Sequence, residues 1–196
     1  MKIAVYGGSF DPPHNGHKLL AENLSKYCGA DKVLIIPAAV SPFKNGGNVS
    51  GEHRLNMCKL LFCDPLFEVS DIELKRGGRS YTVDTLNQVK SIYPDSELYL
   101  FMGDDMLLSF AKWYKYKEIL KLCTVVAACR TKDAEKLDNM GAYVEQYLGG
   151  ADNVMLCPYE PLEISSTEIR GNLKKRKGDG LSPQVYDYIV SRGLYI

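Results

Sequence analysis

Two histidines, His14 and His17, lie in a glycine-rich run directly after the apolar segment Lys2–Tyr6. An apolar run that ends in paired glycines is typical of a buried strand entering a tight turn. Asn15 is placed to cap a helix that holds His17 in its first turn. Because a helix start exposes unpaired N–H groups and a partial positive charge, this junction predicts an anion site in which two imidazoles bind phosphate oxygens.

This turn also has plainer interpretations. A glycine-rich strand-to-helix turn can reflect topology alone. It is neither the dinucleotide fingerprint, which needs a third glycine, nor a P-loop, which needs Gly-Lys-Ser/Thr. His14 and His17 could bind zinc, but the chain has only one other histidine, His53, and no C-x-x-C pair. A zinc site is therefore poorly supplied with ligands, and phosphate binding is favoured.

A second hydroxyl-rich helix start lies late in the chain, where Ser165, Ser166 and Thr167 are followed by Arg170 about one turn inside the helix. Three hydroxyls and a guanidinium at a helix start predict a cradle for a polyphosphate. The plainer interpretation is a capping box, since Ser165 and Glu168 have the spacing that it needs. The sequence alone leaves both open.

For several other positions the sequence likewise leaves open a structural role and a ligand-binding role. Asp105 follows an apolar segment and a glycine, so it is either a first-turn acid favoured by the helix dipole or a ligand for a ribose hydroxyl or a magnesium-bound water. Thr82 is equally a helix cap or a ligand. Trp113 lies in a polar run, which suits stacking on a heterocycle or partial burial against its own helix. Lys44, in the polar loop Ala38–Ser50, is either a surface lysine or a phosphate contact.

Alternating strands and helices must position these residues. The predicted strands are Lys2–Tyr6, Lys32–Pro37, Phe67–Ile72, Glu97–Met102, Cys123–Arg130 and Asn153–Cys157. The predicted helices include Glu52–Phe62, Asp133–Leu148 and Pro183–Ser191, and further helices begin near Asn15, Thr82, Asp105 and Ser165. Strand–helix–strand units at this spacing are right-handed and predict an α/β fold with a doubly wound, mostly parallel sheet. Ligands of such sheets bind at the carboxyl edge, where the strand order reverses.

Composition narrows the class of protein. A chain of 196 residues suits a single domain, 1–196, with a helical C-terminal subdomain from about residue 160. The 24 basic and 24 acidic residues balance, which argues against a nucleic-acid partner or an anionic membrane surface. No apolar run is long enough to cross a bilayer. Six scattered cysteines without a signal peptide indicate reduced thiols and a cytoplasmic location.

Two motifs carry a family resemblance. The run Gly7–His17 matches the signature of the nucleotidyltransferase superfamily with the His-x-Gly-His motif, and Ile164–Arg170 resembles its second signature. Within that superfamily, Ser80-Tyr81-Thr82, Gly103-Asp104-Asp105 and Phe110–Tyr114 resemble the bacterial nicotinate-mononucleotide adenylyltransferases. The likeness runs nearly end to end.

The resemblance implies a Rossmann-like nucleotidyltransferase fold with a C-terminal helical extension. It also implies an enzyme of NAD biosynthesis that joins ATP and nicotinate mononucleotide into deamido-NAD and pyrophosphate. The reaction would be a direct in-line attack on the α-phosphate, with Mg²⁺ accompanying ATP. Such a transfer needs positioning and charge stabilisation more than covalent catalysis by the protein.

Residue by residue, the resemblance implies that His14, His17 and Arg170 are catalytic. The implied ATP-binding residues are Gly8, Ser9, Phe10, His14, His17, Gly103, Asp105, Ser166, Thr167 and Arg170. The implied substrate-binding residues are Lys44, Thr82, Trp113, Tyr114 and Arg130, and no protein ligand to a metal is expected. Where the family usually has Pro-Pro-His-Lys, this chain has Ser41-Pro42-Phe43-Lys44. Phe43 cannot donate a hydrogen bond, whereas Lys44 keeps the expected contact with the mononucleotide phosphate.

The expected partners are therefore the small molecules ATP and nicotinate mononucleotide, with no nucleic acid and no membrane; a homo-oligomer is compatible with the sequence. One rival function is another adenylyl or cytidylyl transferase, such as the pantetheine-phosphate enzyme, whose chains are typically shorter and lack the Trp-Tyr element. The other is a nucleotide-binding module that binds ATP without releasing pyrophosphate.

Overall fold

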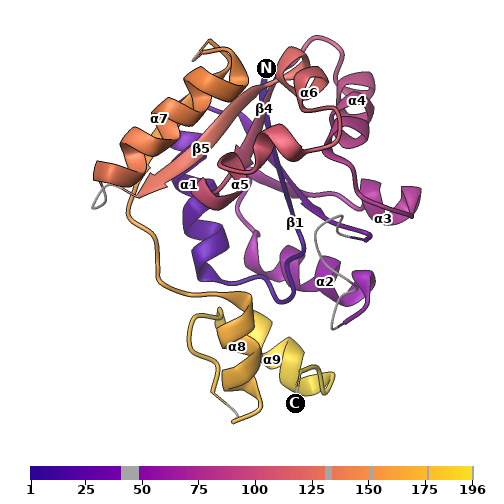
Figure 1. The fold of residues 1–196 in the computed structure, drawn as a ribbon. Coiled ribbons are helices and arrows are strands. Elements are labelled where there is room, and N and C mark those ends of the chain that lie inside the picture. Colours follow the sequence, from indigo (N-terminus) through magenta and orange to yellow (C-terminus); the bar gives the residue numbers. More distant parts are fainter. Residues whose placement is uncertain (41–48, 131–133, 151, 176, 196) are drawn as a thin grey trace. The chain divides into compact units, whose positions relative to one another are not determined.

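The computed structural model describes residues 1–40, 49–130, 134–150, 152–175 and 177–195. Its strands are β1 (Lys2–Gly8), β2 (Lys32–Pro37), β3 (Phe67–Val69), β4 (Glu97–Met102), β5 (Thr124–Arg130) and β6 (Val154–Tyr159). Its helices are α1 (Asn15–Cys28), α2 (Gly51–Leu61), α3 (Ile72–Arg76), α4 (Thr82–Ile92), α5 (Asp104–Leu107), the 3₁₀ turn η1 (Phe110–Lys112), α6 (Tyr116–Leu122), α7 (Ala134–Leu148), α8 (Ser166–Leu173) and α9 (Pro183–Ser191) (Figure 1).

The strands form a parallel sheet in the order β3-β2-β1-β4-β5-β6. In register, Val5 of β1 pairs with Leu100 of β4, and Leu100 pairs in turn with Val125 of β5. The prediction of a doubly wound α/β fold is confirmed. The strand order reverses between β1 and β4, which is where sheets of this kind bind their ligands, outside the carboxyl ends of the strands.

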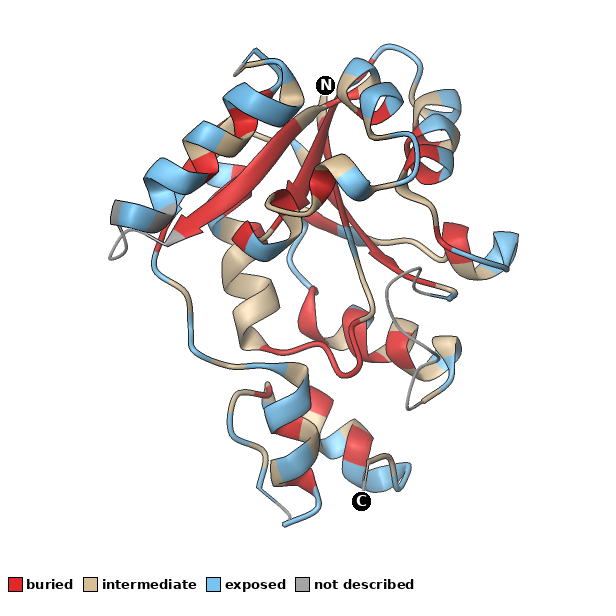
Figure 2. Cartoon of the chain, viewed as in Figure 1, coloured by how far each residue is buried: buried red, intermediate tan, exposed pale blue. Residues whose placement is uncertain are grey.

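The central strands are buried almost without interruption. Ile3, Ala4 and Val5 of β1 are at most 1% exposed, and most residues of β2, β4 and β5 after the first are also buried (Figure 2). Continuous apolar runs of this kind are expected when helices cover both faces of a parallel sheet. The sheet is therefore held by the hydrophobic effect, which leaves the loops after the strands free to carry polar groups.

The chain packs as two compact units. The first consists of Met1–Tyr6, Leu20–Val33 and Tyr81–Pro161, and the second of Gly7–Leu19, Leu34–Ser80 and Leu162–Ile196. In the first unit, α7 runs alongside β5 (Figure 1). In the second unit, α9 packs against α2, where the Tyr188 hydroxyl contacts His53 Nδ1 at 2.9 Å and accepts from Asn56 Nδ2 at 3.2 Å. The single domain 1–196 with a helical part from residue 160 stays a prediction.

Several predicted boundaries were wrong. The strand predicted to end at Ile72 stops at Val69, and Ile72 instead begins α3 behind Asp71. The Asp71 side chain makes no capping hydrogen bond and instead pairs with Lys75 one turn on, at 3.1 Å. The helix predicted after Gly103 is split into α5 and η1. Strand β6 runs on to Tyr159 through Pro158, which is tolerated because β6 is an edge strand.

Within the described ranges, no helix combines the length and the apolar character that a bilayer crossing needs.

Candidate active site

The junction between β1 and α1 differs in one position from the prediction. Asn15 is the first residue of α1, and the carbonyl of His14 accepts from the N–H groups of His17 at 2.9 Å and Lys18 at 3.3 Å. His14, not Asn15, therefore occupies the cap position. His17 Nδ1 in turn accepts from the backbone N–H of His14 at 3.2 Å. This bond is one half of a capping box, in which the third helical residue reaches back to the cap N–H; the other half, a bond from the cap side chain to the N–H of His17, is not made by His14.

This hydrogen bond decides the tautomer of His17. A ring nitrogen that accepts from an N–H group carries no proton, so the neutral His17 ring holds its proton on Nε2. In that tautomer the Nε2–H group is a hydrogen-bond donor, and the bond through Nδ1 fixes the orientation of the ring.

The His14 ring stacks on the His17 ring, with a centroid separation of 3.7 Å and an angle of 33° between the planes. His14 is only 6% exposed, and burial lowers its pKa to about 4. At neutral pH His14 is therefore uncharged, because desolvation penalises the imidazolium. Its Nδ1 atom is buried and has no hydrogen-bond partner among the described residues. A buried ring nitrogen without a partner is unusual, and a bound ligand is one way to satisfy it.

Two glycines leave space for the rings of His14 and Phe10. A Cβ on Gly16 would lie 3.0 Å from His14 Nδ1, and one on Gly8 would lie 3.1 Å from the ring of Phe10. Phe10 is 1% exposed, and its ring meets His17 edge-on at 5.1 Å. Since the side chain of Phe10 is in the core, only its backbone is available to a ligand.

The second signature reaches the first through two hydrogen bonds. Ser166 Oγ donates to the carbonyl of Pro12 at 3.0 Å, and Arg170 Nη1 donates to the carbonyl of Asp11 at 2.6 Å. Arg170 Nη2 also donates to Thr167 Oγ1 at 3.0 Å. The start of α8 is thereby attached to the residues immediately before His14. Both motifs belong to the second unit, and these bonds join the start of α8, with Ser166, Thr167 and Arg170, to the loop that leads to His14 and His17.

Ser165 has the other role that the sequence left open. Its Oγ accepts from the N–H of Glu168 at 3.1 Å, which makes Ser165 the N-cap of α8. The two neighbouring serines therefore do different work: Ser165 caps the helix, and Ser166 attaches it to the loop.

Arg54 was not predicted as a site residue. It is 5% exposed, and its guanidinium donates to the carbonyls of Ser9 and Ala38, each at 2.7 Å. These carbonyls follow β1 and β2, so one buried side chain fixes the exits of two strands. The sequence signal was an arginine on the buried face of α2, in line with Met57, Cys58 and Leu61. Arginine is almost never buried without hydrogen-bond partners.

In the first unit, the exit of β4 holds two acids with different surroundings. Asp104 is 7% exposed, and its Oδ1 accepts from the N–H of Asp105 at 2.8 Å. Asp105 is exposed, and its Oδ1 lies 3.0 Å from where a Cβ on Gly103 would be. Gly103 therefore leaves space for the Asp105 carboxylate. The buried acid, Asp104, was not among the predicted site residues.

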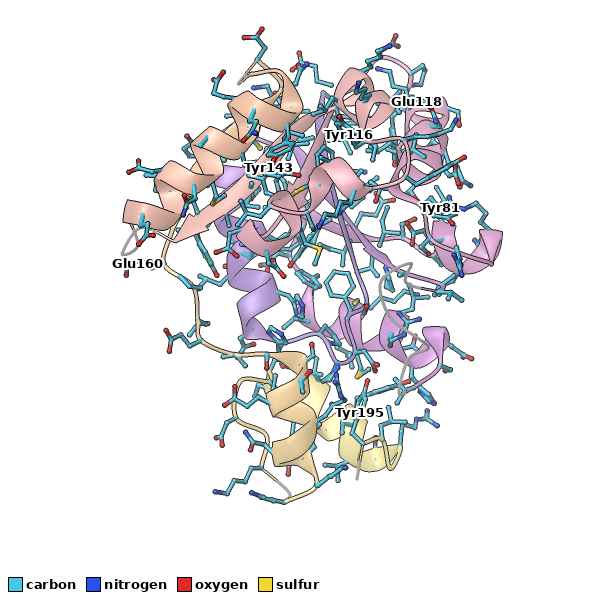
Figure 3. The ribbon with its side chains drawn as sticks, viewed as in Figure 1. Tyr81, Tyr116, Glu118, Tyr143, Glu160 and Tyr195 are labelled. Carbon is cyan, nitrogen blue, oxygen red and sulfur yellow. The ribbon has the colours of Figure 1, made fainter. Side chains whose placement is uncertain are left out.

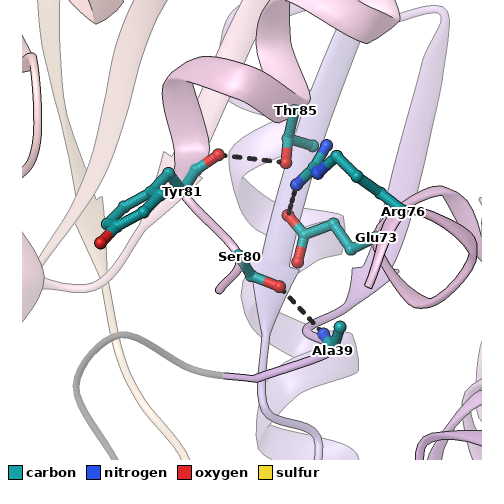
Figure 4. A network of polar contacts seen from close by, with 6 residues as sticks. All are labelled: Ala39, Glu73, Arg76, Ser80, Tyr81 and Thr85. Atoms are coloured by element: carbon teal, nitrogen blue, oxygen red, sulfur yellow. Dashed lines mark hydrogen bonds and ion pairs between the residues drawn. The ribbon is translucent and has the colours of Figure 1, made fainter. Parts of the chain in front are cut away.

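Thr82 is not the cap of α4. Tyr81 occupies the N-cap position, and the Tyr81 carbonyl accepts from Thr85 Oγ1 at 3.3 Å (Figure 4). The ring of Tyr81 packs on that of Tyr114, 4.7 Å between centroids, and Tyr114 is 53% exposed. An aromatic pair with one exposed member can extend its stacking to another flat ring.

Trp113 is half-buried, and its ring lies 5.2 Å from that of Phe110. The partial burial predicted as one alternative is therefore present. The preceding turn is held by Tyr143 of α7, whose hydroxyl accepts from the N–H of Ala111 at 2.8 Å (Figure 3).

The chain is similar to known proteins over nearly its whole length. A family model described as cytidylyltransferase-like matches residues 5–172. A probable nicotinate-nucleotide adenylyltransferase of Dehalococcoides mccartyi is 38% identical and covers 100% of this chain and 97% of its own. The nicotinate-nucleotide adenylyltransferase of Bacillus subtilis is 34% identical, covering 99% of this chain and 98% of its own.

The chain belongs to the nicotinate-nucleotide adenylyltransferase family.

A solved structure supports the shared fold. The Plasmodium falciparum nicotinic acid mononucleotide adenylyltransferase complexed with NaAD resembles this chain with a TM-score of 0.74 at 20% identity, covering 99% of this chain and 97% of that one. At this identity the likeness concerns the fold, which is the Rossmann-like fold that the sequence predicted.

The other predicted site residues are divided between the two units. The second unit holds the histidines together with Gly8, Ser9 and Phe10. The first unit holds Thr82, Gly103, Asp105, Trp113 and Tyr114. Arg130 is the last residue of β5, opposite Tyr159 of β6 in register. Phe43 and Lys44 lie outside the described residues.

The Ser-Tyr-Thr element of this family member begins with a structural serine. Ser80 is 8% exposed; its Oγ accepts from the N–H of Ala39 at 2.9 Å, and its own N–H donates to the carbonyl of Val40 at 3.0 Å (Figure 4). Ser80 thus holds the backbone at Ala39 and Val40, directly before the segment that contains Lys44. A separate ion pair joins Arg76 to Glu73 in α3, at 3.9 Å.

Proposed function

We propose that the chain transfers the adenylyl group of ATP to nicotinate mononucleotide and releases deamido-NAD and pyrophosphate. The observation that carries this proposal is the attachment of Ser166 and Arg170 to the carbonyls of Pro12 and Asp11, next to the stacked pair of His14 and His17. Two motifs distant in sequence are thereby joined, which supports a shared role in binding a triphosphate. Membership of the nicotinate-nucleotide adenylyltransferase family supports the choice of substrates.

In the proposed reaction, an oxygen of the mononucleotide 5′-phosphate attacks the α-phosphorus of ATP in line with the bridging oxygen to the β-phosphorus. The new P–O bond forms as the old one breaks, and the electron pair leaves on pyrophosphate. No covalent intermediate with the protein is needed. Catalysis then consists of aligning the two phosphates and stabilising the charge that develops on them.

The donors divide this work. His17 offers Nε2–H, because Nδ1 is occupied by the backbone N–H of His14. His14 takes part as a neutral ring, since burial lowers its pKa to about 4. Arg170, with Ser166 and Thr167, stabilises the β- and γ-phosphates and the departing pyrophosphate. The fixed charge of a guanidinium suits this role, because the leaving group gains negative charge.

The other assignments follow the family resemblance and are part of the proposal. Gly8, Ser9 and the backbone of Phe10 line the adenylate, and Gly103 and Asp105 bind the adenosine ribose. Trp113 stacks on the pyridine ring, whose carboxylate accepts from backbone N–H groups near Thr82 and Tyr114. Lys44 contacts the phosphate of nicotinate mononucleotide, and Arg130 contributes to binding the same substrate.

We propose that Mg²⁺ enters as part of the ATP substrate. Among the described residues, no group of three His, Cys, Asp or Glu side chains is arranged to hold a metal ion. Mg²⁺ commonly binds through substrate phosphates and water with few protein ligands, which suits a site built from imidazole, hydroxyl and guanidinium donors.

The proposed partners are the two small-molecule substrates, without nucleic acid or membrane, and assembly into a homo-oligomer remains compatible with the proposal. The cytoplasm is the proposed location. In support, all six cysteines are free thiols; five are buried and Cys63 is exposed. Free thiols persist in reducing compartments.

The test is a coupled pyrophosphate assay with ATP and each of nicotinate mononucleotide, nicotinamide mononucleotide and phosphopantetheine. Turnover is expected with the nicotinate substrate. His17→Ala should lower kcat/KM at least about a hundredfold, as expected for loss of a transition-state donor. His53→Ala is the matched control. It also removes an imidazole, but His53 contacts Tyr188 on α9 and is not one of the proposed phosphate-binding residues, so kcat/KM should be unchanged.

Two results would contradict the proposal. Pyrophosphate release with phosphopantetheine alone would identify the pantetheine-phosphate type of transferase. ATP binding in a calorimeter without turnover of any acceptor would identify a nucleotide-binding module.

A further inference from the structure

The buried carboxylate of Asp11 is bound by the far end of the chain. Asp11 is 6% exposed, and Tyr195 donates its hydroxyl hydrogen to Asp11 Oδ1 at 2.5 Å, across 184 positions of sequence. Tyr195 lies just beyond α9 in the C-terminal segment (Figure 3). Hydrogen bonds to an ionised carboxylate are among the stronger ones in proteins.

Asp11 is also the anchor of Arg170. Its backbone carbonyl accepts from Arg170 Nη1 at 2.6 Å, and the carbonyl of the next residue, Pro12, accepts from Ser166 Oγ at 3.0 Å. One residue therefore holds the C-terminal segment with its side chain and α8 with its main chain. A shift of Asp11 must move the carbonyl to which Arg170 is attached.

The Tyr195 hydroxyl keeps its proton. Burial, followed by the hydrogen bond to Asp11 and the charge of that carboxylate, raises the pKa of Tyr195 far above its usual value. The charges of Arg54 and Arg170 oppose this shift without reversing it. Tyr195 is therefore protonated at neutral pH and donates to Asp11.

The backbone at Tyr195 is held in an unusual conformation. Its φ is +62°, in the left-handed region that residues other than glycine rarely adopt. The turn that leads there is fixed by Gly193 N–H donating to the carbonyl of Val190 at 3.2 Å and Leu194 N–H donating to that of Ile189 at 3.0 Å. An unfavourable conformation of this kind persists only where the surrounding contacts maintain it.

We propose that Tyr195 is a positioning residue for the transfer reaction: by holding the Asp11 carboxylate, it fixes the Asp11 carbonyl and so the Arg170 guanidinium against the phosphates of ATP. This inference rests on the proposed function. Tyr195 itself touches neither substrate. Its effect passes from the C-terminal segment through one carboxylate to the guanidinium that meets the leaving group.

The test compares Tyr195→Phe with Tyr188→Phe. Each variant loses one hydroxyl near the C-terminus, but the Tyr188 hydroxyl joins α9 to α2 and does not contact Asp11. Tyr195→Phe should lower kcat/KM for ATP about tenfold, the loss expected from one displaced charged hydrogen bond. The KM for nicotinate mononucleotide should not change, and Tyr188→Phe should keep the kcat/KM of the unmodified chain.

A double-mutant cycle separates positioning from general destabilisation. If Tyr195 acts through Arg170, Tyr195→Phe should cost less than about twofold in a chain that already carries Arg170→Gln, because effects transmitted through one partner are not additive. An additive loss, or an equal loss in Tyr188→Phe, would overturn the inference.

A binding measurement keeps the two proposals distinguishable. Inorganic triphosphate, titrated in a calorimeter, should bind Tyr195→Phe about tenfold more weakly than the unmodified chain and Tyr188→Phe equally well. If the unmodified chain releases no pyrophosphate, the proposed function fails, while this arm still decides whether Tyr195 positions an anion-binding group. Unchanged triphosphate affinity in Tyr195→Phe counts against the inference whether or not the enzyme turns over.

Discussion

At the scale of single residues, the missing Cβ of Gly16 determines where His14 can lie. The histidine ring packs against the backbone at Gly16, and a Cβ there would come within 3.0 Å of Nδ1. Contacts between a real Cβ and a ring atom are rarely that close, so any side chain at this position must displace the ring. The glycine of the His-x-Gly-His motif therefore leaves the space that the ring of the first histidine, His14, occupies.

Gly16→Ala tests this requirement. Alanine favours a helix over glycine by up to about 1 kcal/mol, so the variant should fold at least as well as the unmodified chain apart from the contact with His14. Its kcat/KM should nevertheless fall at least about tenfold, because the Cβ displaces His14 from the position in which we propose that it meets the phosphates. The pyrophosphate assay measures the loss. Gly141→Ala in α7, where a Cβ meets nothing within 4 Å, is the matched control; equal activities in the two variants would contradict the explanation.

Arg54 provides a second prediction at this scale. Replacing it with Met leaves the carbonyls of Ser9 and Ala38 without their donor, which should cost about 1–3 kcal/mol in the free energy of unfolding. The activity should fall as well, since the exit of β1 loses its support. Urea denaturation measures the stability. Arg192→Met, which removes an exposed guanidinium 5.8 Å from the Tyr188 ring, should change it by less than about 0.5 kcal/mol.

At the scale of elements, α8 shows how one helix start serves both folding and function. Ser165 accepts from the N–H of Glu168, whereas Ser166 donates to the carbonyl of Pro12. The first bond lies within α8, and the second ties α8 to the loop before His14. The helix is thereby both capped and oriented, and Arg170 follows one turn later.

Replacing each serine by alanine should affect a different property of the protein. Ser165→Ala removes the cap and should lower the free energy of unfolding by about 1 kcal/mol. Ser166→Ala should lower kcat/KM by a larger factor than Ser165→Ala, because it releases α8 from Pro12. Thermal unfolding and the pyrophosphate assay, run on both variants, measure the two effects. If Ser165→Ala is the less active variant, the assignment of roles is reversed.

At the scale of the whole molecule, the buried His14 links stability to pH. Its pKa is about 4 in the folded chain and 6.5 ordinarily, so between these values the unfolded chain binds more protons than the folded one. Stability contributed by neutral His14 is therefore fully present above pH 6.5 and is lost as the pH falls towards 4. The loss should be on the order of 3 kcal/mol, at about 1.4 kcal/mol per pH unit.

Urea denaturation from pH 7 to 4 measures this dependence. His14→Gln should flatten the curve in the window between pH 6.5 and 4, since glutamine does not titrate there. His53→Gln should keep the slope, because His14 is unchanged in it. A slope that survives in His14→Gln would assign the effect to other groups.

The sequence by itself determined where the main strands and helices lie along the chain. Compact apolar segments such as Lys32–Pro37 and Glu97–Met102 became β2 and β4 with the predicted bounds, because parallel strands covered on both faces are apolar almost throughout. The helix Pro183–Ser191 was also predicted correctly, since its serine cap and first-turn proline are local signals. Local composition suffices where the physical cause is local.

Only the tertiary structure decided how the polar groups are used. Ser165 and Ser166 are adjacent and alike in sequence, and their roles differ because only Ser166 faces a carbonyl from more than 150 positions earlier. The same holds for Arg54, whose partners at Ser9 and Ala38 come from two other segments, and for Tyr195 with Asp11. A hydrogen bond across the fold depends on where two distant backbones meet, and hydrophobic burial of the whole chain sets that meeting point.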